Sequence, residues 1–143
     1  MATSKIKAVL ESSIDEVWKT VLNVENYRSW RSDLLKVEKI NEGQFIEYTK
    51  KGYPTTFTVT QVDPCRYWAF DMENTNMKGH WVGIFTNKGN TTEIEFTEEV
   101  EAKKFFMRPF LKAFLRRQQR VFVEDLRKGV GECIYRESDN TGF

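Results

Sequence analysis

The residues that build metal sites, disulfide frameworks and histidine-dependent catalysis are scarce in this sequence. Cysteine occurs twice, at Cys65 and Cys133, and histidine once, at His80, among 143 residues. The cysteines lie far apart and lack metal-ligand spacing, so we expect neither a zinc site nor a disulfide, and a reducing compartment fits them. A nucleophile elbow, a phosphate-binding glycine loop and a dinucleotide fingerprint are also missing. The sequence therefore predicts no metal, no cofactor and no established catalytic motif.

Long apolar runs and a strong net charge are missing as well. No run of about 18 apolar residues occurs that could span a membrane, and residues 1–7 have no apolar core of a signal peptide. The formal net charge is +1, which argues against a strongly electrostatic partner for the whole chain. We expect a cytoplasmic monomer or weak dimer with no membrane span, and we do not expect nucleic acid as its main partner.

Aromatic residues are abundant instead, with 11 Phe, five Tyr and four Trp. Such large, rigid apolar side chains suit a thick core or the walls of a cavity. The length fits one domain with one core, which we place at residues 1–135, followed by a polar tail at 136–143.

Periodicity divides the chain into a strand, two short helices, six more strands and a long helix. Alternation around residues 6–10 predicts the first strand, and Ser13 with Glu16 forms a capping box that opens a helix ending near Asn23. A second short helix or turn follows at 24–30. Strand patterns then occupy 35–40, 44–49, 55–62, 67–72, 77–86 and 91–100. A helical apolar period begins near residue 104, with Pro109 close to its start, and stops at Gly129 and Gly131.

These elements predict an α+β fold with a curved antiparallel sheet of about seven strands. The sheet has one apolar face to cover, and the only long apolar helix is the last one. We therefore expect the sheet to curl around the C-terminal helix.

One strand has an unusual composition. Gly79, Trp81, Gly83 and Phe85 share one face, since strand side chains alternate between faces. Glycine in a strand costs roughly 0.5–1 kcal/mol relative to alanine. The glycines thus indicate that something needs the space above them: a ligand pocket, a neighbouring aromatic ring, or a local bulge or curvature of the sheet.

Several segments are similar to one known superfamily. They are Ser13-Ile14-Asp15-Glu16-Val17-Trp18, Tyr27-Arg28-Ser29-Trp30, Val62-Asp63-Pro64, the Gly-His-Trp-Val-Gly-Ile-Phe strand and Thr91-Thr92-Glu93-Ile94-Glu95-Phe96. With the order of elements over about residues 4–130, they resemble the START-like helix-grip superfamily, in its SRPBCC polyketide cyclase/dehydrase branch. The resemblance implies a deep apolar cavity between the sheet and the C-terminal helix, used by relatives for lipids, sterols or polyketides. It supplies no catalytic residue, because the family has none in common.

In that geometry, Gly79 and Gly83 become the expected cavity floor, and Trp30 is expected at its mouth. Each aromatic taken singly also fits ordinary core packing. The full set of expected ligand-binding residues is Trp30, Phe57, Val59, Trp68, Phe70, Gly79, Trp81, Gly83, Phe85, Phe110 and Phe114.

Glu98 and Glu47 are the candidates for a polar or catalytic group. Alternation places Glu98 with Phe96, and Glu47 enters the cavity if Phe45 does. A one-residue bulge would turn either carboxylate to solvent, which is the more ordinary outcome. His80 should point away from the cavity, since it alternates against Trp81.

Three functions remain open. The first is binding or carriage of a hydrophobic small molecule, and it is the one we expect. The second is a metal-free cyclase or dehydratase that orients a reactive ligand, with one carboxylate or tyrosine as proton carrier. The third is an adaptor that docks protein or RNA through basic residues of the last helix, such as Arg116, Arg117 and Arg120.

Overall fold

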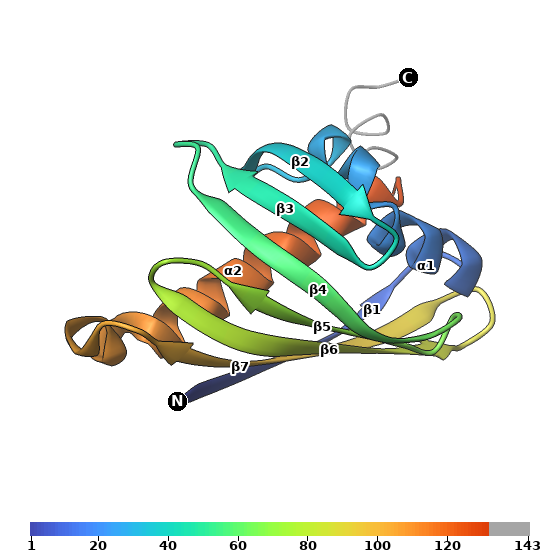
Figure 1. The fold of residues 1–143 in the computed structure, drawn as a ribbon. Coiled ribbons are helices and arrows are strands. Elements are labelled where there is room, and N and C mark those ends of the chain that lie inside the picture. Colours follow the sequence, from blue (N-terminus) through green and yellow to red (C-terminus); the bar gives the residue numbers. More distant parts are fainter. Residues whose placement is uncertain (132–143) are drawn as a thin grey trace, which may run out of the picture.

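A single seven-stranded antiparallel sheet organises the chain (Figure 1). The computed structural model describes residues 1–131; Cys133 and the tail expected at 136–143 lie outside the described residues. The strands are β1 (Ala2–Leu10), β2 (Leu34–Asn41), β3 (Gln44–Thr49), β4 (Pro54–Asp63), β5 (Tyr67–Glu73), β6 (Met77–Asn87) and β7 (Thr92–Ala102). Their order is β1-β7-β6-β5-β4-β3-β2, so β2 to β7 form a meander and β1 closes the row beside β7.

The helices begin and end close to where the sequence predicts. In α1 (Ile14–Leu22), the Ser13 hydroxyl accepts a hydrogen bond from the backbone N–H of Glu16 at 3.3 Å, as a helix cap requires. The short 3₁₀ helix η1 (Val24–Ser29) follows. A second 3₁₀ turn, η2 (Phe105–Met107), leads into the long helix α2 (Arg108–Gly129), whose first turn holds Pro109. Among residues 1–131, no helix is long and apolar enough to cross a membrane.

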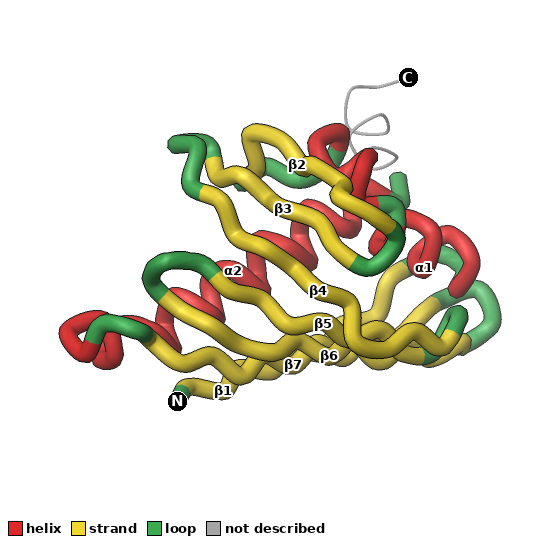
Figure 2. The backbone as a smooth tube through the Cα atoms, in the orientation of Figure 1, coloured by secondary structure: helices red, strands yellow, loops and turns green. Residues whose placement is uncertain are grey.

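The sheet curls around α2, which confirms the predicted helix-grip architecture. In Figures 1 and 2, β5, β6 and β7 lie on one side of α2, while β4 slopes across and carries β3 and β2 to the other side. Irregularities in register between Val59 and Gln61, and within β2, fall in this turning part of the sheet. Such bulges increase local twist and bend.

Helix α2 packs mainly on β1 and β7, at one edge of the sheet. Leu111, Leu115 and Leu126 are buried there. Gln119 is also buried: its Nε2 donates to the Ser4 carbonyl at 2.9 Å, and its Oε1 accepts from the Ser4 hydroxyl at 2.7 Å. The inner face of the remaining strands is covered mainly by aromatic side chains, with α1 against β6 and η1 against β2.

The glycines of β6 serve close packing, which corrects the expectation that they form a cavity floor. A methyl group on Gly79 would lie 2.5 Å from the Glu99 carbonyl oxygen of β7, and one on Gly83 would lie 2.5 Å from the Trp81 ring. Real Cβ atoms do not approach neighbours so closely. Gly79 thus allows the close approach of β7, and Gly83 leaves room for the Trp81 ring.

We expect Gly79→Ala to lower the free energy of unfolding by about 1–3 kcal/mol, because the new methyl group collides with backbone that cannot move aside. Urea unfolding followed by circular dichroism measures the change. Gly43→Ala is the matched control, since its nearest neighbour would be 3.7 Å away. If Gly79→Ala were as stable as the control, the space beside Gly79 would be open after all.

Candidate functional site

A cavity of about 200 Å³ lies between α2, η1 and the concave face of the sheet. Its sheet side is aromatic: the rings of Phe45 and Phe57 stack with centroids 4.9 Å apart, and those of Phe70 and Trp81 stack at 4.7 Å. Helix α2 supplies the opposite wall through Phe114, Leu115, Gln118, Gln119 and Phe122. The cavity is thus a pocket between stacked aromatic rings on the sheet and a wall of α2 that combines apolar side chains with two glutamines.

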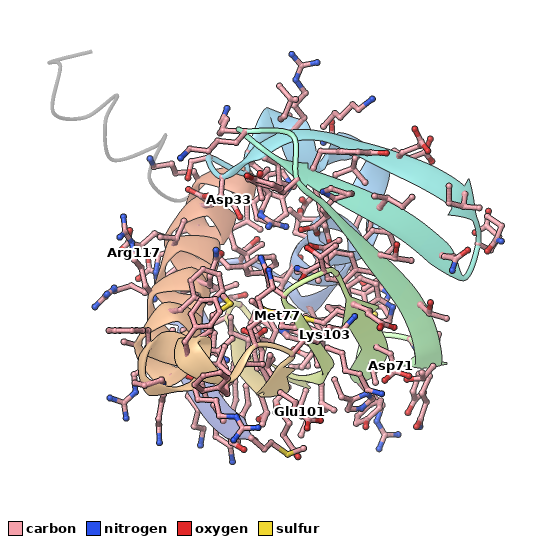
Figure 3. All side chains as sticks on the ribbon, turned by 60° about the vertical axis from the view of Figure 1, so that its left-hand side comes forward. Asp33, Asp71, Met77, Glu101, Lys103 and Arg117 are labelled. Atoms are coloured by element: carbon pink, nitrogen blue, oxygen red, sulfur yellow. The ribbon has the colours of Figure 1, made fainter. Side chains whose placement is uncertain are left out.

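The mouth of the cavity opens where the lining reaches solvent. Thr49, at the end of β3, and Phe114, on α2, are exposed lining residues, and Met77 at the start of β6 is partly exposed. In Figure 3, Met77 lies between α2 and the strands, next to Lys103. Asp33 lies beside the opposite end of α2.

Part of the predicted wall lines this cavity. These residues are Phe57, Trp68, Phe70, Trp81 and Phe114. Each of the four on the sheet is buried, as alternation along β4, β5 and β6 requires. Their role in binding a ligand stays a prediction, which we develop below.

Other predicted residues lie elsewhere. Phe85 packs edge-on against Trp18 of α1, with centroids 5.0 Å apart, and so belongs to the core beneath that helix. Val59 lines a separate hollow beside η1. Gly79 and Gly83 are packed against β7 and Trp81 as described above, outside the cavity lining.

Trp30 and Phe110 need correction for different reasons. Trp30 is buried, with its ring against Gly129 and Phe122, so it anchors η1 to the end of α2 and does not stand at the mouth. Phe110 is 72% exposed. The face of α2 with Leu111 and Leu115 is buried, and Phe110 lies outside it, whereas Phe114, one turn further on, borders the cavity and is 43% exposed.

The polar end of the cavity is built around Arg31, which the sequence analysis missed. Its guanidinium lies between the rings of Tyr27 and Phe122, at 5.2 and 4.9 Å from their centroids. It donates two hydrogen bonds to Asp33, both 2.9 Å long, and two to Glu47, both 3.3 Å long. All five residues line the cavity. One cation is therefore held by two carboxylates and two aromatic rings.

Burial and neighbouring charges shift the pKa values of Arg31 and Glu47 in opposite directions. Burial by itself would lower the pKa of Arg31, yet the charges of Glu47 and Asp33 raise it. Burial raises the pKa of Glu47, and Arg31 only partly offsets this. Burial also raises the pKa of Tyr27, whose hydroxyl donates to the Val21 carbonyl. Arg31 is consequently a fixed cation.

Glu98 also faces the cavity, and its charge is not neutralised. Burial, with a smaller contribution from Glu47, raises its pKa to about 7, against which Arg31 acts only weakly. No hydrogen bond joins its side chain to another residue in the described part of the chain, whereas Glu47 has Arg31. Both predicted carboxylates thus lie on the cavity wall, in different electrostatic settings.

His80 lies on the outer face of β6, as predicted. Its Nδ1 is 2.6 Å from Asp71 Oδ1, in a pair of largely exposed side chains. It therefore has no access to the cavity.

The fold first defines the class of protein. The helix-grip arrangement is similar to that of a START superfamily protein from Mycobacterium smegmatis, with a TM-score of 0.81 at 12% identity, covering 92% of this chain and 98% of that one. Zhui aromatase/cyclase from Streptomyces sp. R1128 gives 0.79 at 15% identity, covering 93% and 95%. Norcoclaurine synthase from Thalictrum flavum, in complex with dopamine and hydroxybenzaldehyde, gives 0.70 at 12% identity, covering 89% and 84%.

A comparison of the amino-acid sequence with known protein families identifies the family of this chain. Residues 1–131 match the family described as polyketide cyclase / dehydrase and lipid transport, and the chain belongs to it. This is the branch that the sequence resemblance indicated. No curated protein matches the chain in sequence. At identities of 12–15%, the solved structures establish the shared fold alone.

The raised pKa of Glu98 makes stability depend on pH. The unfolded chain loses this proton near the ordinary value of 4.5, whereas the folded protein keeps it up to about 7. Between these values the folded state binds more protons, so the contribution of Glu98 to the free energy of unfolding falls as pH rises. Glutamine at position 98 carries no charge, so it would not lower the free energy of unfolding as pH rises.

We therefore expect Glu98→Gln to be more stable than the wild type by about 1–3 kcal/mol near pH 8, with a smaller difference near pH 5. Chemical unfolding at both pH values measures it. Glu99→Gln, the neighbouring exposed carboxylate on the opposite face of β7, is the control. A stability difference that did not vary with pH would contradict the assigned environment of Glu98.

Proposed function

We propose that the protein binds a compact hydrophobic molecule that carries a hydrogen-bond donor, such as a hydroxyl or amine group, at one end. The observation that carries the proposal is the combination of an aromatic cavity with an uncompensated carboxylate at Glu98. Binding energy would come from burying the apolar body of the ligand. The carboxylates would orient its polar end. The cytoplasm is the location we propose for this activity.

Cavity size favours a small ligand over a long lipid. Ligand pockets commonly measure about 300–1,000 Å³, and an apolar cavity of about 150 Å³ holds one benzene molecule. At about 200 Å³, this cavity suits a ligand of one or two rings.

Charge favours a neutral or cationic ligand over a carboxylate. Among the described residues that line the cavity, Arg31 is the one cation, while Asp33, Glu47 and Glu98 are acidic. The donors of Arg31 already bind Asp33 and Glu47. A ligand carboxylate would lack a free cation and would face Glu98, which like-charge repulsion disfavours.

A pair of probes with the same ring system tests this preference. We expect β-naphthol to bind at least about tenfold more tightly than β-naphthoate near pH 8, a difference of about 1.4 kcal/mol. Isothermal titration calorimetry measures both affinities. Glu98→Gln should narrow the gap by improving naphthoate binding. Equal or tighter binding of naphthoate by the wild type would overturn the proposed ligand class.

A variant that fills the mouth of the cavity tests whether the probe binds inside the cavity. Met77→Trp should weaken β-naphthol binding at least about tenfold, because the larger side chain occupies the cavity entrance. Lys78→Trp adds the same ring at the next residue of β6, which points to the other face. Loss of binding in both variants, or in neither, would place the probe outside this cavity.

A cyclase- or dehydratase-type enzyme is the second candidate, favoured by the pKa of Glu98. A carboxyl group with a pKa near 7 is present in both protonation states at neutral pH, so it can accept and return a proton. The neighbouring aromatic walls would hold the reacting ring in place.

Exchange of a carbon-bound proton separates this enzyme from a carrier. With β-tetralone in D₂O, the Glu98 carboxylate would remove a proton next to the carbonyl and leave an enolate. The protonated carboxyl would exchange its proton with D₂O and then return a deuteron to the same carbon, which NMR detects. Exchange accelerated by the wild type and abolished in Glu98→Gln, with β-naphthol binding retained, would identify an enzyme. If the protein does not accelerate the exchange, the result would favour a carrier over this type of enzyme.

A further inference from the structure

A cluster of exposed phenylalanines marks one end of the molecule, outside the cavity. Phe105, Phe106 and Phe110 are 77%, 61% and 72% exposed, and the first two rings contact each other with centroids 6.2 Å apart. They lie on η2 and the first turn of α2, which project beyond the sheet at the left of Figure 1. Contiguous large apolar groups of this kind usually mark an interaction surface. We call Phe105, Phe106 and Phe110 the phenylalanine tip.

Positive charge surrounds this tip. From residue 103 to residue 123 the chain has seven Lys and Arg and no Asp or Glu. Lys103 is paired with Glu73 at 2.7 Å. Lys104, Arg108 and Lys112 are exposed next to the phenylalanines, and none forms an ion pair within residues 1–131. An apolar tip with a basic surround is complementary to an apolar layer covered by anions.

The tip is continuous with the mouth of the cavity. Phe110 and Phe114 lie one helical turn apart on α2, and Phe114 is both exposed and part of the cavity lining. The backbone N–H of Lys103 donates to the Asn76 carbonyl at 2.8 Å, which fixes the segment before η2 beside Met77. Figure 3 shows Met77 and Lys103 close together at this end of α2. A surface that covers the tip would therefore also lie against the cavity entrance.

We propose that the phenylalanine tip docks the protein on membranes that contain anionic lipids. The phenylalanine side chains insert at the level of the lipid headgroups, and Lys104, Arg108 and Lys112 contact the phosphates and carboxylates of those headgroups. Amphipathic helices with basic flanks and aromatic residues bind bilayer surfaces in this way. Each basic residue near an anionic surface adds to the attraction, which salt weakens. Docking needs no ligand in the cavity, so it goes beyond the proposed function.

A bilayer fits the tip better than RNA does. The three phenylalanines project from the end of α2 that lies beyond the sheet, where an apolar medium can surround them. A second copy of the chain would have to cover the same basic segment with an identical basic segment, which repulsion opposes.

Vesicle sedimentation tests the proposal with the intact chain. We compare vesicles of phosphatidylcholine alone with vesicles of phosphatidylcholine mixed with an equal amount of phosphatidylserine. The wild type should bind the anionic vesicles at least about tenfold more tightly, and added salt should weaken this binding. The combined change Phe105→Ser, Phe106→Ser and Phe110→Ser should abolish it. Removal of two exposed apolar side chains on β4 and β6, by Val62→Ser and Ile84→Ser, should have little effect.

Reversing the charge of the basic residues around the tip gives an independent test of membrane docking. Lys104→Glu with Arg108→Glu should lower binding to anionic vesicles at least about tenfold. Lys19→Glu with Lys88→Glu, which changes the net charge equally at exposed positions far from the tip, should preserve most of it. Circular dichroism establishes that every variant is folded, and β-naphthol titration of the phenylalanine variant tests the cavity separately, because none of its three residues lines the cavity.

Other occupants of the tip would overturn the proposal. Self-association in analytical ultracentrifugation that the phenylalanine variant removes, without vesicle binding, would identify a second copy as the partner. Salt-sensitive binding of an oligouridylate, again without vesicle binding, would identify RNA. Equal binding of the wild type and the phenylalanine variant to anionic vesicles would reduce the tip to a nonspecific basic surface.

Discussion

The fold depends on one constraint: a single long helix must cover the apolar face of a seven-stranded sheet. Helix α2 packs mainly on β1 and β7, so the remaining strands curl over it and cover their inner face with aromatic side chains, with α1 against β6 and η1 against β2. Stacked pairs such as Phe45 with Phe57 fill most of this space. What they leave is the cavity. The pocket is thus a consequence of how the sheet closes on the helix.

The electrostatics of that cavity follow from the burial of Arg31. A buried guanidinium is tolerated only when carboxylates and hydrogen bonds compensate its lost hydration. Asp33 and Glu47 do this, and the rings of Tyr27 and Phe122 hold the group in place. Burial raises the pKa of Glu98 on the cavity wall, the charge of Glu47 adds to the rise, and Arg31, which binds Asp33 and Glu47, does not cancel it. The same helix that closes the cavity begins at the exposed phenylalanine tip, so the cavity mouth and the proposed docking surface lie on neighbouring turns of α2.

Most of the fold was predictable from the sequence, because its signals are local. Strand alternation, the Ser13 cap and Pro109 in the first turn of α2 each act over a few residues. The site was predictable only in part. Alternation placed Trp68, Phe70 and Trp81 on the inner face. It could not tell whether the glycines border an empty space or packed atoms, because that depends on where the fold places the Glu99 backbone and the Trp81 ring. Arg31 was missed because an arginine after a short helix usually lies in solvent, and its partners are Asp33 and the distant Glu47.

The account depends most directly on an ionisable, uncompensated Glu98 in the cavity wall. Carbon-13 NMR titration of the glutamate side-chain carboxyl carbons, with Glu98→Gln to assign the resonance, measures its pKa in the folded protein. We expect a midpoint at about 7 for Glu98 in the ligand-free protein. A midpoint near the ordinary value of 4.5 would show that Glu98 is hydrated or paired, and it would contradict both the proposed ligand class and the proposed proton transfer.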